Sequence, residues 1–525
     1  MKEKRDRGTV LLGVLLPVAF LYVWGVLLLF PQYAARQFLW PAAWLFLAGV
    51  VFFCLLVLAA SLVKRTVKAI DRRGENRLLF AASVMLLGAE LLISWNIAFQ
   101  TGWDPGAVWY GAWYSATEDA AGLAQMSEYF SIYPNNLLLC FLYSVVLKLN
   151  LAVGAPVSNG ILLLDALQCV VLMVSGALTY RCARRFVGVR GAWLAYGMYV
   201  ILAGLSPWMA VPYSDGTGIL FPVLLLWLYL RMRESGGRKQ LLFLALLAAA
   251  SYVGFKIKPT ALIVSIAIGV VELLRAAGKI AVGGGKETAG RLLRGLGVSA
   301  AAGACAVLLV QLAVGSLSLT INPEAQLGIA HYFMIGSDPE SGGGFSQEAL
   351  DFSSGIASKK ERTAANMQAF GEHLQTMGVS GYADLWNRKA VKTYLDGTFG
   401  WGGVGESFYV ITYPERGALG RWLRLWYYDD RPDTLYAYHA LALQLVWVTL
   451  LVAVPFSVCQ RAACGTGRKV LALSVLGLML YLQIFEAQSR YLFIYVPFYC
   501  MLAAIGIRNA AALLRQRRER GGKEK

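Results

Sequence analysis

Charged side chains are scarce in this sequence. Asp, Glu, Lys and Arg make up 15% of the 525 residues, whereas 58% are hydrophobic and the mean hydropathy is +0.55. These proportions exclude a soluble protein, because a chain of this length has too little interior to cover so much apolar surface. Apolar runs of about 20 residues, which cross a bilayer as helices, recur along the whole chain. We therefore expect an all-α polytopic membrane protein with about 12 transmembrane helices.

Three further features of the sequence limit the kinds of site that the protein can form. The eight Cys lie in apolar runs or short basic loops, and the polar segment 316–434 has none, so no disulfide framework is expected. The three His are scattered along the chain, and they predict no metal site. The Gly-rich stretch AVGGGKETAG continues from Lys286 to Glu287 rather than to Ser or Thr, which excludes a P-loop. We interpret this stretch as a linker.

The placement of Lys and Arg orients the expected helices. Basic clusters recur after every second apolar run, which predicts that both termini are cytoplasmic. The net charge of +17 then indicates contact with anionic lipid headgroups rather than with nucleic acid. The first run is followed by no small-residue cleavage site and is expected to remain as a span. The expected spans lie near 10–30, 42–63, 78–98, 158–180, 191–211, 214–230, 240–257, 260–275, 296–315, 436–458, 470–485 and 491–508.

Two segments are expected outside the membrane, opposite the termini. No Lys or Arg occurs from Leu78 to Leu147, so the loop 99–135, with short helices, is placed outside. Segment 316–434 is long enough for a mixed external subdomain or lid. If the apolar segment 136–152 crossed the membrane, it would invert the alternation of basic loops, so we expect it to be re-entrant or surface-lying. The chain then divides into a transmembrane module 1–315, the external segment 316–434, and C-terminal helices with a basic tail, 435–525.

An acid among aromatic residues opens the first outer loop. Asp104 follows directly after the third expected span, and Pro105 and Gly106 break the helix there. Aromatic rings stack on the C–H faces of sugars while a carboxylate binds hydroxyl groups, so this pattern indicates a carbohydrate site. The alternative is an aromatic belt at the membrane surface with a helix-capping Asp. The expected sugar-stacking residues are Trp103, Trp109 and Trp113.

Cationic residues lie at two other outer turns. The stretch FKIKPT contains Lys256 and Lys258, and EAQSRYLF contains Glu486 and Arg490. Charges so close to hydrocarbon are costly and are typically functional. The phosphate of a lipid-linked substrate would suit them, because Arg offers a bidentate fork and Lys a point charge. Glu486 would orient Arg490 or bind a hydroxyl. Snorkelling to lipid headgroups is the alternative.

Three further acids leave the function open. Asp215, in VPYSDGTG, is either a helix cap or a second carboxylate of the site. Glu90 and Asp165 fall inside expected spans, where acids are functional by default. A transporter or flippase of a lipid-linked saccharide is therefore a second hypothesis beside an enzyme.

These motifs, in this order and on one side, resemble the GT-C superfamily of membrane glycosyltransferases. The resemblance rests first on the early Asp104 and on the Tyr-Pro pair at Tyr133, in YFSIYPNNLLL, which begins an apolar segment. It rests also on Asp215 and on the stretches KIKPT and EAQSRYLF. The most similar branch contains protein O-mannosyltransferases and aminoarabinose transferases, in a form found in Gram-positive bacteria. The resemblance covers roughly residues 78–270 and 470–508, and the external segment matches no family.

The resemblance implies a specific reaction. A polyprenyl-phosphate-linked sugar would be the donor, and Asp104 the general base in an inverting displacement. Lys256, Lys258 and Arg490 would bind the donor phosphate, with Tyr133 in support. The acceptor would be a hydroxyl of a cell-wall polymer, lipid or protein outside a bacterial cytoplasmic membrane. Many such enzymes carry paired acids in the first loop, but here Pro105 follows Asp104, which leaves the need for a divalent metal open; no other cofactor is expected.

Overall fold

The computed structural model describes residues 7–62, 71–100, 102–281, 285–401, 411–428, 435–458 and 465–521. Parts of the sequence features above lie outside these ranges, among them Cys459, Cys464, the stretch 429–434 and some basic residues near both termini. Within the described ranges, twelve helical segments are long and apolar enough to cross a membrane. The protein is therefore an all-α integral membrane protein, as its composition predicted.

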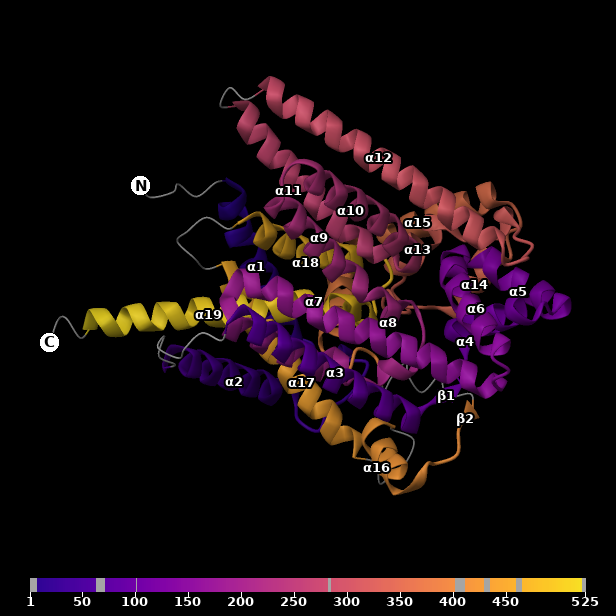
Figure 1. Cartoon of the computed structure of the whole chain (residues 1–525), viewed down its shortest axis with the longest axis horizontal. Coiled ribbons are helices and arrows are strands. Elements are labelled where there is room, and N and C mark those ends of the chain that lie inside the picture. Colours follow the sequence, from indigo (N-terminus) through magenta and orange to yellow (C-terminus); the bar gives the residue numbers. More distant parts are fainter. Residues whose placement is uncertain are drawn as a thin grey trace.

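Long helices dominate the structure (Figure 1). Two short strands, β1 (Phe99–Gln100) and β2 (Ile411–Thr412), form an antiparallel pair in which Phe99 lies opposite Thr412. The helices are α1 (Arg7–Leu29), α2 (Ala42–Leu62), α3 (Arg72–Ile97), α4 (Trp103–Thr117), α5 (Ala120–Ile132), α6 (Leu137–Ala152), α7 (Val157–Tyr199), α8 (Ser214–Gly218), α9 (Leu220–Glu234), α10 (Gly237–Ile257), α11 (Leu262–Ala281), α12 (Gly285–Gly315), α13 (Gly328–Ser337), α14 (Gln347–Ser354), α15 (Lys359–Tyr394), α16 (Gly417–Tyr427), α17 (Tyr436–Ala453), α18 (Thr466–Ile484) and α19 (Val496–Gly521).

Helix α7 consists of two antiparallel helical segments rather than one straight helix. Gly188 has φ 76° and ψ −176°, which is outside the helical region. The hydroxyl of Tyr199 donates to the carbonyl of Leu172 at 2.7 Å, although the two residues are 27 positions apart. A straight helix would separate them by about 40 Å. The chain therefore turns back at Gly188, and the two spans expected at 158–180 and 191–211 lie side by side.

This turn leads to a testable prediction about stability. The backbone conformation of Gly188 is accessible almost only to glycine and costs other residues about 1–3 kcal/mol. We expect Gly188→Ala to lower the free energy of unfolding by that amount, measured by thermal unfolding of the purified protein. Gly197→Ala, in the same element, is the control, because its added Cβ would meet nothing within 4 Å. Equal stability of the two variants would contradict the hairpin turn.

One end of the molecule carries the elements of the first outer loop. The start of α1 and the end of α19 lie at the left of Figure 1, whereas α4, α5, α6 and the strand pair lie at the right. Helix α6, the segment expected to be re-entrant, packs against α4 and α7 at this end. Its length and hydropathy would also permit a span. Its placement as re-entrant or surface-lying stays a prediction.

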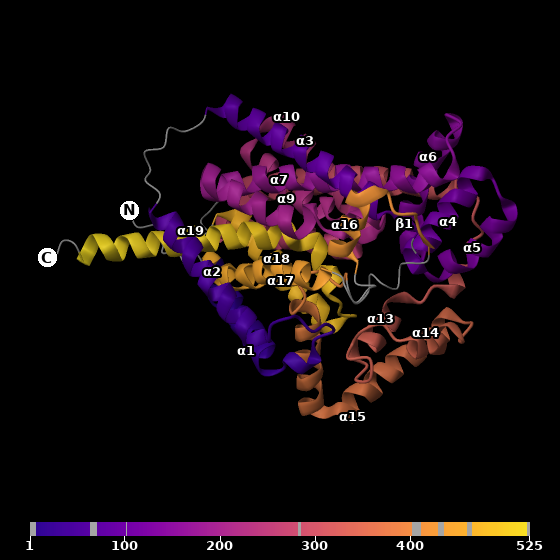
Figure 2. The same cartoon turned by 90° about the horizontal axis from the view of Figure 1, so that it is seen from below.

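The described parts of the external segment 316–434 are mostly helical and contact the membrane helices at several points. Figure 2 shows α13, α14 and α15 on one side of the helical core. Helix α15 contacts α1 and α18, and β2 pairs with β1. Because β1 ends at Gln100, this pairing attaches the external segment four residues before Asp104. The core itself is centred on α19, the most enclosed of the long helices.

Candidate active site

The carboxylate of Asp104 is held at the N-terminal end of α4 by two tyrosines. The hydroxyl of Tyr129, in α5, donates to Asp104 Oδ1 at 2.8 Å, and the hydroxyl of Tyr213, which precedes α8, donates to Oδ2 at 3.2 Å. Asn136 Nδ2 in turn donates to the Tyr129 hydroxyl at 2.7 Å. Pro105 follows as the third residue of α4, still within the first turn, where a backbone N–H would have no partner inside the helix. Asp104 is therefore an oriented acceptor that is half-buried rather than a solvated surface acid.

Electrostatics link this acid to the cationic turns. Burial and the charge of Asp104 raise the pKa values of both Tyr129 and Tyr213 well above the usual range, so both remain hydrogen-bond donors. Arg490 opposes this shift in the pKa of Tyr213, whereas Asp215 adds to it. The Tyr213 hydroxyl thus lies within the fields of Asp104, Asp215 and Arg490 at once.

Two cations, Lys258 and Arg490, lie beside the ring of Tyr491, and Asp215 pairs with Lys258. Lys258 Nζ lies 2.6 Å from Asp215 Oδ1, and both side chains are largely buried. Lys258 Nζ also lies 4.8 Å from the centre of the Tyr491 ring, and Arg490 Cζ lies 5.4 Å from it. Residues far apart in sequence are therefore gathered by α8, by the start of the turn Pro259–Ala261, and by the turn Ser489–Tyr495.

Glu486 faces the same region from the end of α18. Burial raises the pKa of Tyr133, and Asp104 and Glu486 both add to this rise. Burial also raises the pKa of Tyr332 in α13, and the same two acids, Glu486 and Asp104, add to this rise. Tyr133 is therefore near enough to both acids, Asp104 and Glu486, for their charges to act on its hydroxyl. The geometry brings together Asp104, Tyr133, Asp215, Lys258, Glu486 and Arg490.

The remaining predicted site residues lie at the margin. Lys256 forms no hydrogen bond or ion pair with any residue that the structure describes. Trp103 is 63% exposed and meets the ring of Phe345 edge-on at 6.4 Å. Trp109 and Trp113 stack on each other at 6.0 Å. Their mutual stacking occupies one face of each ring.

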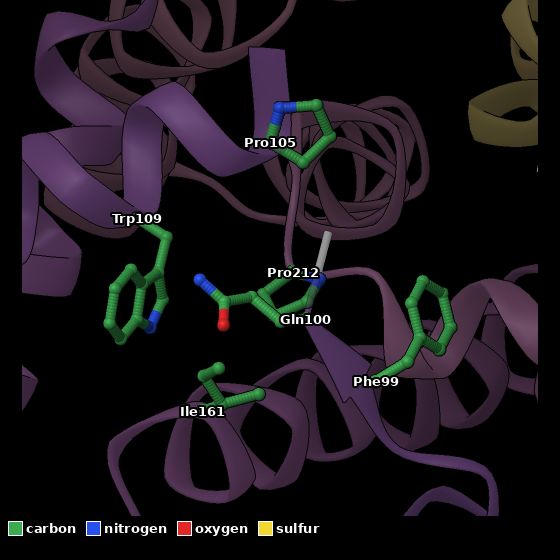
Figure 3. A pocket seen from close by; sticks show the side chains of 6 residues that line it. All are labelled: Phe99, Gln100, Pro105, Trp109, Ile161 and Pro212. Atoms are coloured by element: carbon green, nitrogen blue, oxygen red, sulfur yellow. The ribbon is translucent and has the colours of Figure 1, made fainter. Parts of the chain in front are cut away.

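A small pocket is lined in part by Pro105, the residue after Asp104 (Figure 3). Its volume of about 10 Å³ holds roughly one water molecule, so it is too small for a sugar ring. The Trp109 ring lines one side of it. The lining residues are Phe99, Gln100, Pro105, Trp109, Ile161 and Pro212.

The sequence also matches a family model across most of its length. A family described as conserved hypothetical integral membrane proteins matches residues 26–511. The chain belongs to this family. No curated protein matches it. A crystal structure of ArnT from Cupriavidus metallidurans bound to undecaprenyl phosphate is similar, with 13% identity, a TM-score of 0.31, and coverage of 84% of this chain and 79% of that one. A TM-score this low establishes neither a shared fold nor a shared activity.

The described residues do not form a metal site made of protein side chains alone. No three His, Cys, Asp or Glu side chains among these residues lie close enough to hold an ion. Asp104 is followed by Pro105, and its carboxylate is already bonded to two tyrosine hydroxyls.

Several polar groups of the candidate site were not predicted from the sequence. Tyr129, Tyr213 and Asn136 orient Asp104, and Tyr491 lies beside both cations. They stand in stretches already singled out, YFSIYPNNLLL, VPYSDGTG and EAQSRYLF, but tyrosine and asparagine are common at membrane surfaces. No local signal separates an orienting tyrosine from an aromatic belt.

The external segment adds two lysines of α15. Lys389 is fully buried and its ammonium donates to the carbonyls of Gly336, Gln483 and Phe485 at 2.7–2.9 Å. Burial lowers the pKa of Lys389 to about 7, and Glu486 opposes this shift. Lys392 is half-buried against Gly344, and burial lowers its pKa while Glu486 again opposes the shift. Lys389 thus fastens the external segment to the turn that carries Glu486.

These two lysines give a matched pair of variants. We expect Lys389→Met to destabilise the protein by about 3 kcal/mol, because three carbonyls, one buried and two part-buried, lose their donor. Lys392→Met should change stability by less than about 1 kcal/mol, because Lys392 has no hydrogen bond or ion pair within the described ranges. Thermal unfolding and limited proteolysis of segment 341–400 measure both. Equal proteolysis of the two variants would argue against the fastening role of Lys389.

Proposed function

We propose that this protein is a glycosyltransferase that moves a sugar from a polyprenyl-phosphate donor to a hydroxyl acceptor outside the cytoplasmic membrane. One observation carries the proposal: Tyr213 donates to Asp104 while lying in the field of Arg490 and of Asp215, which itself pairs with Lys258. An oriented carboxylate and a group of cations thus face one region beside the membrane helices. The resemblance of the outer-loop motifs to GT-C enzymes supports the same class.

Asp104 is the proposed general base. The acceptor oxygen attacks the anomeric carbon, a new C–O bond forms, and the hydroxyl proton passes to the carboxylate. The bond from the anomeric carbon to the phosphate oxygen breaks, and its electron pair leaves with the lipid phosphate. A single displacement inverts the anomeric centre. A positioned base of this kind contributes about 10²–10⁴-fold to the rate.

Arg490 and Lys258 are the proposed partners of the leaving phosphate. Negative charge develops on the phosphate as the glycosidic bond breaks, and fixed cations in a partly dehydrated site stabilise it strongly. Asp215 balances Lys258 while the donor is absent. Lys256 and Lys392 would add longer-range attraction for the anionic donor. Trp103, with its exposed ring, is the proposed stacking surface for a sugar, beside Trp109 and Trp113.

The orientation follows from the basic loops. Both termini are proposed to be cytoplasmic, so α4, α5 and the site face the outside of a bacterial cytoplasmic membrane. A carrier that is anchored in lipid can reach this level with its phosphate at the headgroup depth. The acceptor is then a hydroxyl of a cell-wall polymer, a lipid or a protein.

The direct test is an assay of the purified protein in nanodiscs with a panel of polyprenyl-phosphate sugars and soluble or lipid acceptors. We expect one donor to be consumed with release of polyprenyl phosphate, and the new bond to have inverted anomeric configuration, which NMR measures. Retention of configuration would overturn the single-displacement mechanism. Absence of donor turnover across the panel would overturn the enzymatic proposal.

A transporter or flippase of a lipid-linked saccharide is the second candidate. Glu90, in α3, is fully buried, and neither of its carboxylate oxygens has a hydrogen-bond partner within the described ranges. Asp165, in α7, is 1% exposed. Buried acids of this kind occur along transport pathways. In proteoliposomes, movement of a labelled lipid-linked sugar that Glu90→Gln abolishes and Asp104→Asn leaves intact would favour the transporter.

A further inference from the structure

Helix α16 begins beside the exposed Trp95 at the end of α3. The Arg416 guanidinium lies 3.7 Å from the centre of the Trp95 ring, and its Nη1 donates to the Trp95 carbonyl at 2.7 Å. Arg424 donates to the carbonyl of Asn96 at 3.1 Å. Figure 1 shows α16 beside the ends of α3 and α17, and it packs against both. Because these contacts are made to the last carbonyls of α3, they hold α16 at the end of that span.

The residues of α16 divide into distinct faces. Gly420, Leu423 and Tyr427 are buried at i, i+3 and i+7, and they form the face toward the protein. Leu419 is 45% exposed and Trp422 is 52% exposed. At 100° per residue, Leu419, Trp422 and Trp426 form a stripe that points roughly 100° away from the buried face. Leu419 and Trp422 thus give the helix a second, largely exposed apolar side, and the half-buried Trp426 connects this side to the protein core.

This stripe continues the lipid-facing surface of α3. Leu92 and Trp95 of α3 are 51% and 50% exposed, and α3 is a membrane-spanning helix. Arg416 joins Trp95 directly to the first turn of α16. Two exposed apolar surfaces that meet at the end of a span fit one continuous contact with hydrocarbon.

The basic residues of α16 complement lipid headgroups. Arg421 is exposed on the side of the helix away from the stripe. Arg416, Arg421 and Arg424 form no ion pair within the described part of the chain. Arginine forks bind phosphates in pairs of hydrogen bonds, and basic amphipathic helices lie in the membrane interface.

We propose that α16 is an interfacial helix whose Leu419 and Trp422, flanked by Trp426, insert into the bilayer at the end of α3, while its exposed Arg421 binds a lipid phosphate. The occupant of the exposed stripe is the lipid surface itself. The helix anchors β2, and through β1 the loop before Asp104, at headgroup depth. This inference does not depend on the proposed transferase activity.

Depth-dependent quenching tests the proposal. Single-cysteine variants Leu419→Cys, Trp422→Cys and Arg421→Cys, in a background without other cysteines, are labelled with an environment-sensitive fluorophore in nanodiscs of phosphatidylcholine and phosphatidylglycerol. We expect labels at positions 419 and 422 to be quenched several-fold more strongly by brominated lipid chains than by aqueous iodide. The label at position 421 should show the opposite preference.

Two outcomes would overturn the proposal. Strong iodide quenching at positions 419 and 422 would place the stripe in water. Protection of both positions from both quenchers would mean that protein, a second copy or a partner, covers it. In the unaltered protein, a phospholipid with a photoreactive group near its headgroup should label peptide 417–427, which mass spectrometry detects; no labelling of that peptide would likewise overturn it.

Discussion

Asp104→Asn should reduce sugar transfer by about 10³-fold, within the range expected for loss of a positioned base. Asparagine keeps the shape of the side chain and an oxygen that Tyr129 or Tyr213 can donate to, so the site should stay folded. It cannot accept the proton of the acceptor hydroxyl. Because the donor contacts lie on other elements, we expect kcat to fall while the KM for the donor changes little.

Asp119→Asn is the matched control for this variant. Asp119 is exposed in the same outer loop and caps α5 by accepting from the N–H groups of Ala121 and Gly122. Asparagine caps helices about as well as Asp, so this variant should keep wild-type transfer. Full activity of purified Asp104→Asn would rule out this residue as the base.

Arg490→Gln should weaken binding of the polyprenyl-phosphate donor by about 10–100-fold, since a hydrogen bond to a charged group contributes about 1.5–3 kcal/mol. The loss should appear in both the KM for the donor and kcat, because the same guanidinium would stabilise the phosphate as it leaves. Donor affinity can be measured directly with the product, polyprenyl phosphate, as a competitor.

Two comparisons sharpen this second test. Arg490→Lys keeps the charge but loses the fork, and it should restore only part of the affinity. Arg388→Gln removes an arginine of α15 that pairs with Asp384 on the surface, and it should leave donor binding unchanged. If Arg490→Gln binds the donor as tightly as the wild type, the phosphate site lies elsewhere.

The charged residues of the candidate site stand out in the sequence because the surrounding sequence has so few charges. Asp104, Lys258 and Arg490 each stand in a turn next to an apolar span, where an ionised group is costly. The tyrosines that hold Asp104 could not be found this way, since tyrosine is ordinary at a membrane surface. Lys389 and Lys392 lie in α15, where lysines are expected on any solvated helix and carry no signal of burial.

The sequence by itself determined that this protein is embedded in a membrane and roughly how many helices cross it, because the length of an apolar run and the bilayer thickness leave little choice. The tertiary structure alone decided which side chains meet. Asp104, Asp215, Lys258 and Arg490 are separated by dozens to hundreds of residues, and no helical period brings such positions together. Their convergence depends on helix packing and on turns such as the one at Gly188, and both depend on contacts between distant segments.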